Sequence, residues 1–449
     1  MKNFAKKLLL ILFSAFLGLA ICEIGLRLFG FKYSGSTFTA DPLLGWSLRP
    51  GASAWEVDEG FARSKINSHG YRDRERALSK PRDVYRVAAL GDSLTEARQV
   101  DMDKTFTSLA EEELNRRRCC GERRAEVLNF GIGGFGTAQE LLLLRERVWK
   151  FDPDMIVLQF YAGNDMFNNN RALNISTPDK APYFLLKNGK LELDDSFRQA
   201  RAFDPAYIRM KGIGADIMNS FVLLQLVYKL RRVRAQQEEL ARLDGAGRPS
   251  APDAPPPGYQ RYLPFLPPTI PSMVEAWQVT EALIAEMGKE VRSHHASLLV
   301  MIMPTDIQIN PDPQKQEAYR AKYHIESLEY ADDRVEQSAR ENGIPVLRMT
   351  RPLVEEARRS GTYLAGFANT APNDGHLNER GHAVVARELV RAICEIASGR
   401  ATASERRLDA LRDGRRLDQR PGGSATAQLV KPGIATVDAL NLPRKDGCQ

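Results

Sequence analysis

The chain has 449 residues, of which 43% are hydrophobic and 27% are charged, and its formal net charge is +6. This composition is that of a globular protein with a large core, and the length corresponds to about three domains. The sequence has no basic stripe interleaved with aromatic residues, which argues against a nucleic-acid-binding protein. The five cysteines are odd in number and include no C-x-x-C pair, so we expect neither a metal site nor a disulfide framework.

The first segment, residues 1–30, has the pattern of an export signal. Lysines at three of the first seven positions precede an uncharged apolar run from Leu8 to Cys22. A positive start before an apolar core is typical of such signals, and the lysines favour the cytoplasmic side of the membrane. Because no small-residue cleavage site follows, the sequence favours an uncleaved signal anchor, with the rest of the chain outside the cytoplasm. A chain secreted after signal cleavage is the alternative.

Short apolar runs alternate with amphipathic stretches from residue 85 onward, after a loop-rich N-terminal extension over residues 31–84. Strands that are apolar on both faces and alternate with helices predict a parallel sheet that is covered on both sides. The predicted strands are RVAAL (86–90), EVLNFGI (126–132), MIVLQFY (155–161), SLLVMIM (297–303) and IPVLRM (344–349).

Residues 166–270 interrupt this alternation and are predicted to form an insertion, for which a lid is one interpretation. The insertion has a hairpin pattern with Asn188-Gly189 at its turn, an amphipathic helix over 221–243 and a Pro-rich linker. The tail over 398–449 lacks strand periodicity and is predicted to be disordered.

A serine follows the end of the first predicted strand, in the segment Gly91-Asp92-Ser93. Ligands of parallel sheets bind at this end of the strands. A serine hydroxyl becomes a nucleophile when a base, usually histidine, removes its proton and a carboxylate orients that base. His376 offers the base and Asp374 the carboxylate, in the segment PNDGHLNERGH.

Two further loops follow the second and third predicted strands. NFGIGGFGT contains Gly134, whose backbone N–H can approach a ligand closely because glycine has no side chain. YAGNDMF contains Asn164, which offers a side-chain amide. Together with the backbone N–H of Ser93 at a helix N-terminus, these donors could form an oxyanion hole.

These segments resemble the SGNH (GDSL-type) hydrolase family, in particular its membrane-anchored bacterial members. The resemblance implies a three-layer, flavodoxin-like α/β fold with a central parallel sheet of about five strands, over residues 85–397. It assigns the nucleophile to Ser93, the base to His376, and the oxyanion hole to Ser93, Gly134 and Asn164.

The acid of the triad departs from the family's usual spacing. Many members place an aspartate three residues before the histidine, where this chain has Asn373. Asp374 lies two residues before His376, as in some polysaccharide-modifying members, and is the residue that the resemblance offers.

The function implied by the resemblance is an extracytoplasmic serine ester hydrolase that forms an acyl-serine intermediate and needs no cofactor and no metal. Its substrate would be a small-molecule or polysaccharide acyl ester. One alternative is an O-acyltransferase acting on cell-surface polysaccharide; another is a non-catalytic envelope-binding protein on the same fold. No G-x-S-x-G motif occurs, so the nucleophile elbow of α/β-hydrolases is absent.

Several of these residues also allow other interpretations. Residues 131–136 match the dinucleotide pattern G-x-G-x-x-G, although they follow the second strand and not the first. Asp374 and His376 could form half of a metal site, but no third ligand has suitable spacing. Asp92 is predicted to cap a helix, and His382 to pack or cap at the start of the last helix.

Overall fold

The computed structural model describes residues 2–245 and 258–398. The described residues belong to one unit that ends at Ser398. Two predicted segments lie largely outside the described residues. They are the Pro-rich linker and the tail predicted over 398–449, of which the first residue is described.

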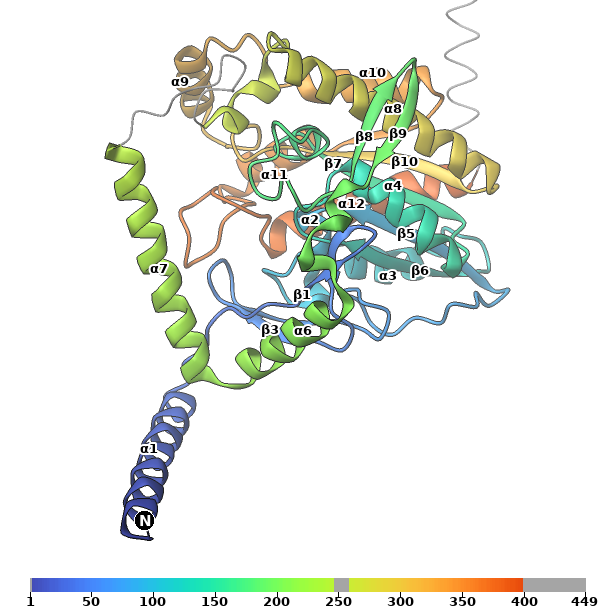
Figure 1. The fold of residues 1–449 in the computed structure, drawn as a ribbon. Helices are drawn as coiled ribbons and strands as arrows, with labels where there is room; N and C mark the ends of the chain where they lie inside the picture. Colours follow the sequence, from blue (N-terminus) through green and yellow to red (C-terminus); the bar gives the residue numbers. More distant parts are fainter. Residues whose placement is uncertain (1, 246–257, 399–449) are drawn as a thin grey trace, which may run out of the picture. The chain divides into compact units, whose positions relative to one another are not determined.

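The core of the protein is a five-stranded sheet whose paired strands all run parallel, in the order β11-β10-β7-β5-β6 (Figure 1). Its strands are β5 (Val84–Gly91), β6 (Arg124–Gly131), β7 (Met155–Tyr161), β10 (Ser297–Met303) and β11 (Val346–Arg348). The five predicted strands are confirmed, with β11 shorter than expected.

Twelve α-helices are present in the described residues. They are α1 (Lys2–Leu28), α2 (Ser93–Glu96), α3 (Phe106–Arg117), α4 (Thr137–Glu146), α5 (Asp165–Asn168), α6 (Pro205–Ser220), α7 (Val222–Gly245), α8 (Pro271–Ser293), α9 (Pro313–Tyr323), α10 (Tyr330–Glu341), α11 (Thr350–Ser360) and α12 (Glu379–Ala397).

The protein has three layers, helices, sheet and helices, because an apolar cluster lies on each face of the sheet. Successive side chains of a strand point to opposite faces. In β5, Ala88 and Leu90 therefore belong to the cluster formed with α4, α8 and α10, whereas Val87 belongs to the cluster formed with α3, α11 and α12. Burial of both faces accounts for strands without polar alternation, and the predicted three-layer α/β fold is confirmed.

The strand order places a topological switch point at β5. The chain passes from β5 to β6 on one side and then to β7 on the other side of β5. The loops that follow β5, β6 and β7 diverge at this point, which is where open α/β sheets bind their ligands.

The N-terminal extension and the insertion contribute three antiparallel hairpins. The extension forms β1 (Phe38–Asp41) with β2 (Gly45–Leu48), and β3 (Ser53–Glu56) with β4 (Ala62–Lys65). The insertion forms β8 (Tyr183–Lys187) with β9 (Lys190–Asp194), and the predicted turn residues Asn188 and Gly189 both have positive φ. The helix predicted over 221–243 is α7, whereas α6 was not predicted.

Helix α1 is long and apolar enough to cross a membrane. Its segment Phe4–Leu28 spans 25 residues, its most apolar 18-residue window has a mean hydropathy of 2.4, and none of that window is buried against the rest of the protein. A signal sequence has the same properties, so the helix is consistent with both the anchor and the cleaved signal expected from the sequence.

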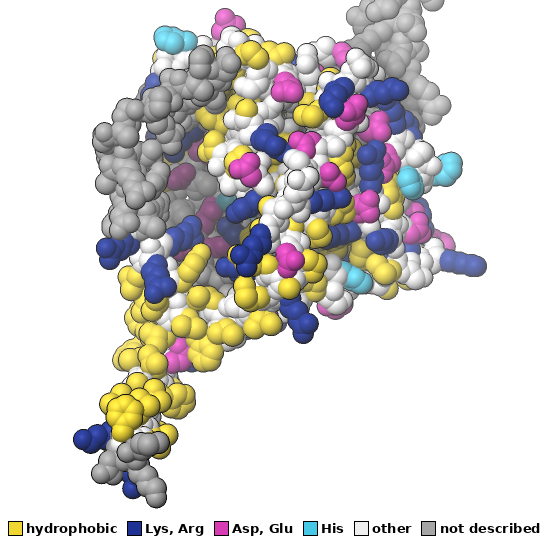
Figure 2. All heavy atoms as spheres, in the orientation of Figure 1, with side chains coloured by type: hydrophobic (Ala, Val, Ile, Leu, Met, Phe, Trp, Pro, Cys, Tyr) yellow, Lys and Arg dark blue, Asp and Glu magenta, His cyan; other side chains and the backbone are white. Residues whose placement is uncertain are grey.

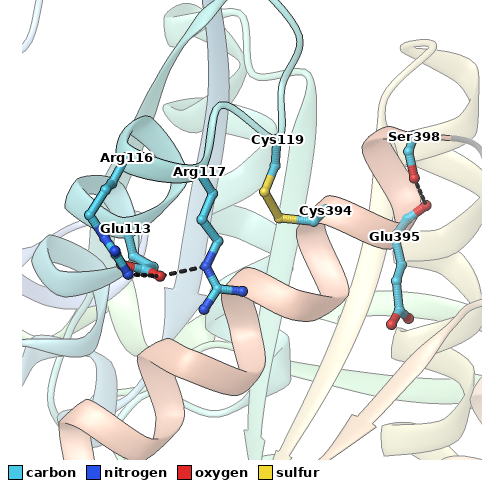
Figure 3. The surroundings of a disulfide bond; sticks show 7 residues. All are labelled: Glu113, Arg116, Arg117, Cys119, Cys394, Glu395 and Ser398. Carbon is cyan, nitrogen blue, oxygen red and sulfur yellow. Dashed lines mark hydrogen bonds and ion pairs between the residues drawn. A yellow bond between two sulfur atoms is a disulfide. The ribbon is translucent and has the colours of Figure 1, made fainter.

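A disulfide joins Cys119, just beyond α3, to Cys394 in α12 (Figure 3). The sequence argued against a disulfide framework, and this single bond corrects that expectation for Cys119 and Cys394. The two cysteines are 275 residues apart, and only the packing of α3 against α12 brings their Cα atoms to 5.0 Å. No local spacing could have indicated the pair.

Replacing Cys394 by alanine is expected to lower the free energy of unfolding by about 2–4 kcal/mol, because a cross-link over a long loop restricts the unfolded chain. Urea unfolding of the oxidised wild type and the variant measures this difference. Dithiothreitol should destabilise the wild type by a similar amount and leave the variant unchanged. An equal response of both proteins to the reductant would contradict the assignment of the bond.

Candidate active site

Ser93 lies at the N-terminus of α2, directly after β5. Asp92 caps this short helix, and its Oδ1 accepts a 2.9 Å hydrogen bond from the backbone N–H of Leu94. Asp92 is fully buried, whereas Ser93 stays partly accessible. The helix-capping role predicted for Asp92 is confirmed, and the turn it stabilises presents the Ser93 hydroxyl at the switch point.

His376 meets Ser93 from the loop before α12. The distance between His376 Nε2 and Ser93 Oγ is 2.8 Å, although 283 residues separate them in the chain. This is hydrogen-bonding distance, the geometry in which an imidazole can take the proton of a serine hydroxyl.

Glu59, in the loop between β3 and β4, holds the other side of His376. Its Oε2 lies 2.6 Å from His376 Nδ1, and its Oε1 accepts a 2.5 Å hydrogen bond from the backbone N–H of His376. One carboxylate thus fixes both the ring and the main chain of the same residue. A serine, a histidine and a glutamate form a continuous hydrogen-bonded chain.

The prediction that Asp374 orients His376 does not agree with this geometry. Asp374 is exposed, and its backbone N–H donates to the carbonyl of Ala371. Gly375, with φ of +90°, turns the chain between Asp374 and His376, and a Cβ there would lie 2.2 Å from Glu59 Oε1. The loop is therefore shaped around Glu59, whose carboxylate takes the place expected for Asp374.

Two effects act in opposite directions on the pKa of Glu59. Burial raises it, but the hydrogen bonds and the charge of His376 outweigh burial, so the pKa of Glu59 is lowered from its ordinary value. Glu59 is therefore a carboxylate at neutral pH and can stabilise a positive charge on the imidazole.

The loop after β6 passes beside Ser93. A Cβ on Gly133 would lie 3.7 Å from the Cβ of Ser93, and φ of Gly134 is +81°. The Gly133 carbonyl accepts a 2.9 Å hydrogen bond from Trp46 Nε1, and the Gly134 carbonyl accepts one of 3.0 Å from Asn168 Nδ2. These bonds fix the orientation of the peptide units. Within residues 2–245 and 258–398, the backbone N–H groups of Ser93 and Gly134 have no acceptor.

Asn164 follows β7 and completes the set of predicted donors. Its Nδ2 donates a 2.9 Å hydrogen bond to Asp92 Oδ2, which leaves the second N–H of the amide for another acceptor. Ser93, Gly134 and Asn164 thus lie beyond the carboxyl ends of β5, β6 and β7, three neighbouring strands. The structure places all three at the same edge of the sheet.

Four buried acidic side chains lie behind these loops: Asp92, Glu96, Glu140 and Asp165. Glu96 Oε2 accepts a 2.7 Å hydrogen bond from Gly133 N, and Asp165 Oδ2 accepts one of 2.7 Å from Tyr161 N. Burial raises the pKa of both Glu140 and Asp165, and nearby acids raise it further. The charge of Asp92 acts on Glu140, and the charges of Glu140 and Asp92 act on Asp165. Glu96 and Asp165 thus support the loops from behind, whereas neither carboxylate oxygen of Glu140 has a hydrogen-bond partner in the described residues. Sequence reasoning did not identify Glu96 or Glu140.

The alternative interpretations of the site residues are tested by the same geometry. The glycine pattern over 131–136 serves contact within the chain, since a Cβ on Gly131 would lie 2.2 Å from the backbone nitrogen of Glu96. His382 is buried, stacks on Phe106 and accepts a hydrogen bond from its N–H, as expected for a packing residue. In the part of the chain that the structure describes, no group of three or more His, Cys, Asp or Glu could hold a metal ion.

Glu59 is the residue of the candidate site that sequence reasoning missed. It lies in the hairpin loop VDEG, which has no motif, and it reaches His376 across 317 residues. The one feature of the sequence that could have indicated Glu59 is that an acidic residue occurs in the extension, before the first strand of the sheet.

Comparison with known proteins identifies a family for most of the chain. The profile of the family described as GDSL-like Lipase/Acylhydrolase matches residues 89–384. No curated protein matches the chain in sequence.

Similar solved structures include three hydrolases at low identity. A catalytic mutant of the acetylxylan esterase Axe2 from Geobacillus stearothermophilus has 14% identity and a TM-score of 0.35, and the match covers 69% of this chain and 94% of that one. The acetyl xylan esterase AlAXEase has 12% identity and a TM-score of 0.34, with 69% and 99% covered. An α/β hydrolase from the metagenome of Lake Arreo, Spain, has 13% identity and a TM-score of 0.33, with 70% and 95% covered.

Proposed function

Because the chain belongs to the GDSL-like lipase/acylhydrolase family and is therefore a carboxylic ester hydrolase, we propose that it acts through an acyl intermediate on Ser93. The observation that carries this proposal is the hydrogen-bonded chain from Ser93 through His376 to Glu59.

In the first step Ser93 Oγ attacks the carbonyl carbon of the ester. His376 Nε2 takes the hydroxyl proton, and the negative charge of Glu59 stabilises the imidazolium that results. The tetrahedral intermediate collapses when the bond to the alcohol oxygen breaks and His376 gives its proton to that oxygen. The alcohol leaves, and the acyl group remains on Ser93.

The negative oxygen of the tetrahedral intermediate needs donors that are already in place. We assign this role to the backbone N–H groups of Ser93 and Gly134 and to Asn164 Nδ2. In the second step water gives a proton to His376 and attacks the acyl carbon, and His376 returns the proton to Ser93 Oγ. The products are the carboxylic acid and the free enzyme.

An aromatic cavity next to the reacting groups gives the substrate a place to bind. A cavity of about 370 Å³ is lined by Phe38 and Trp46 of the extension and by Phe203 and Tyr207 of the insertion. Trp46 hydrogen-bonds Gly133, and a Cβ on Gly133 would contact the ring of Phe38 at 3.4 Å. The extension and the insertion therefore build a wall beside the proposed oxyanion hole, which suits an acyl ester with an apolar portion.

We place the catalytic domain outside the cytoplasm, held to the membrane by α1. Lysines precede the apolar part of α1, which favours a cytoplasmic N-terminus. The Cys119–Cys394 disulfide supports an oxidising compartment. Glu23 in α1 also accepts hydrogen bonds from Val222 and Leu223 of α7, contacts that a cleaved signal would lose.

A fluorophosphonate probe tests the nucleophile. Labelling of the wild-type protein is expected, with loss of labelling in Ser93→Ala and no loss in Ser293→Ala, an exposed serine at the end of α8. Mass spectrometry of the labelled peptide locates the adduct. Equal labelling of the wild type and Ser93→Ala would refute the proposal.

The acceptor of the acyl group is tested on the same intermediate. Release of acetate from a chromogenic acetyl ester in water alone supports hydrolysis. Transfer of the acetyl group to an added oligosaccharide, in preference to water, would instead support the O-acyltransferase that the sequence leaves as an alternative.

A further inference from the structure

The corner between α6 and α7 exposes an unusual number of large apolar side chains. We call these residues the corner strip: Met210, Ile213, Ile217, Phe221, Leu224, Val227, Tyr228, Leu230 and Val233, each between 38% and 60% exposed. A soluble surface rarely gathers so many large apolar side chains in 24 consecutive residues, and such patches mark contacts with a partner or a membrane.

Helix α1 ends at this corner. Glu23 accepts hydrogen bonds of 3.0 and 2.8 Å from the backbone N–H groups of Val222 and Leu223, the first two residues of α7. Arg27 donates a 2.5 Å hydrogen bond to the carbonyl of Ser220, the last residue of α6. The end of the candidate membrane span is therefore fixed to the point where the chain bends by 107° between α6 and α7.

The opposite side of α6 is already occupied by the protein. Tyr207, Ile208 and Gly212 line the aromatic cavity beside β1, and Asp216 pairs with Arg49 at 2.7 Å. Met210, Ile213 and Ile217, spaced three and four residues apart, occupy the remaining face. One face of α6 thus faces the enzyme, although none of its residues is buried, and the other face has no partner in the described residues.

Basic side chains surround the corner strip. Residues 205–234 contain six lysines and arginines and one acidic residue, Asp216. Arg209, Lys211, Lys229, Arg231 and Arg232 are exposed, although Lys229 also pairs with Asp58 at 3.0 Å and Lys211 also lines the aromatic cavity. Figure 2 shows hydrophobic side chains continuing from α1 over the adjoining part of the molecule, with lysines and arginines next to them. This combination is typical of segments that lie in the interface of an anionic bilayer.

We propose that the corner strip inserts into the headgroup layer of a bilayer with anionic phospholipids, next to the point where α1 enters it. The continuity of the strip with the end of α1 and the excess of positive charge favour a lipid surface over a protein partner. The inference rests on the proposed membrane location of α1. It adds a second membrane contact, which fixes the orientation of the enzyme on the surface.

The test uses the full-length protein reconstituted in liposomes of phosphatidylcholine and phosphatidylglycerol. Cys22, Cys120 and Cys448, the cysteines outside the Cys119–Cys394 disulfide, are replaced by serine. One cysteine that carries the environment-sensitive dye NBD is then introduced at a time. The three positions are Ile217→Cys in the corner strip, Leu10→Cys in α1, and Ile175→Cys, an apolar position that is 66% exposed and outside both helices.

We expect blue-shifted emission and quenching by spin-labelled lipid at positions 10 and 217, and neither effect at position 175. Quenching at 217 should decrease when phosphatidylglycerol is omitted. A probe at 217 that behaves like the one at 175, while the probe at 10 is quenched, would overturn the inference and leave the anchor intact. An unquenched probe at position 10 would overturn both, and quenching at 175 equal to that at 217 would show non-specific adsorption and overturn the inference.

Discussion

Replacing Glu59 by glutamine is expected to lower kcat/KM for an ester substrate by about 10³- to 10⁴-fold. Glutamine preserves the size of the side chain but removes the charge that stabilises the imidazolium of His376. The contacts with His376 lower the pKa of Glu59, so the wild-type side chain is ionised at neutral pH. Steady-state kinetics on a chromogenic acetyl ester measure the effect, and Glu59→Asp, which keeps the charge, should retain more activity than Glu59→Gln.

Asp374→Asn is the matched control for this prediction. Asp374 is exposed and its backbone donates to Ala371, so its replacement should leave kcat/KM close to that of the wild type. Unfolding curves of all the variants establish that each is folded. If Asp374→Asn were as inactive as Glu59→Gln, the orienting acid would be Asp374 and the assignment of Glu59 would be wrong.

The contrast between these two acids shows what local sequence patterns can and cannot predict. The resemblance to the SGNH family indicated Asp374, because members of that family place the acid close to the histidine in the chain. Positive φ at Asn373 and Gly375 shapes this loop, and the ring and backbone nitrogens of His376 both contact Glu59. The partner comes from a hairpin in the extension, and no local spacing encodes a contact over 317 residues.

The sheet was predictable for the opposite reason. A strand buried on both faces needs apolar residues along its whole length, so β5, β7 and β10 each leave a continuous signal in the sequence. Because the loops after parallel strands meet at one edge, the alternation of strands and helices predicted that Ser93, Gly134 and Asn164 lie at the same edge of the sheet. The disulfide, like Glu59, depends on how α3 and α12 pack, and was not predictable.

Replacing Asn164 by alanine is expected to lower kcat by about 10²- to 10³-fold, with a smaller effect on KM, because an oxyanion donor acts mainly on the transition state. The hydrogen bond from Asn164 Nδ2 to Asp92 Oδ2 fixes which atom of the amide faces Asp92. Asp92 keeps its second contact, the N–H of Leu94, when Asn164 is removed. The helix that presents Ser93 should therefore remain folded in the variant.

Asn170→Ala provides the comparison, since Asn170 lies in the same segment but donates to Glu275. Asn170→Ala should change kcat little. A large effect of Asn164→Ala alone would therefore come from loss of the oxyanion donor and not from disturbance of the loop. Single-turnover acylation distinguishes the two roles of Asn164, because an oxyanion donor speeds formation of the acyl-enzyme as well as its hydrolysis. If Asn164→Ala were acylated at the wild-type rate, Asn164 would serve only to position Asp92 and would not be an oxyanion donor. The N–H groups of Ser93 and Gly134 would then have to stabilise the oxyanion alone.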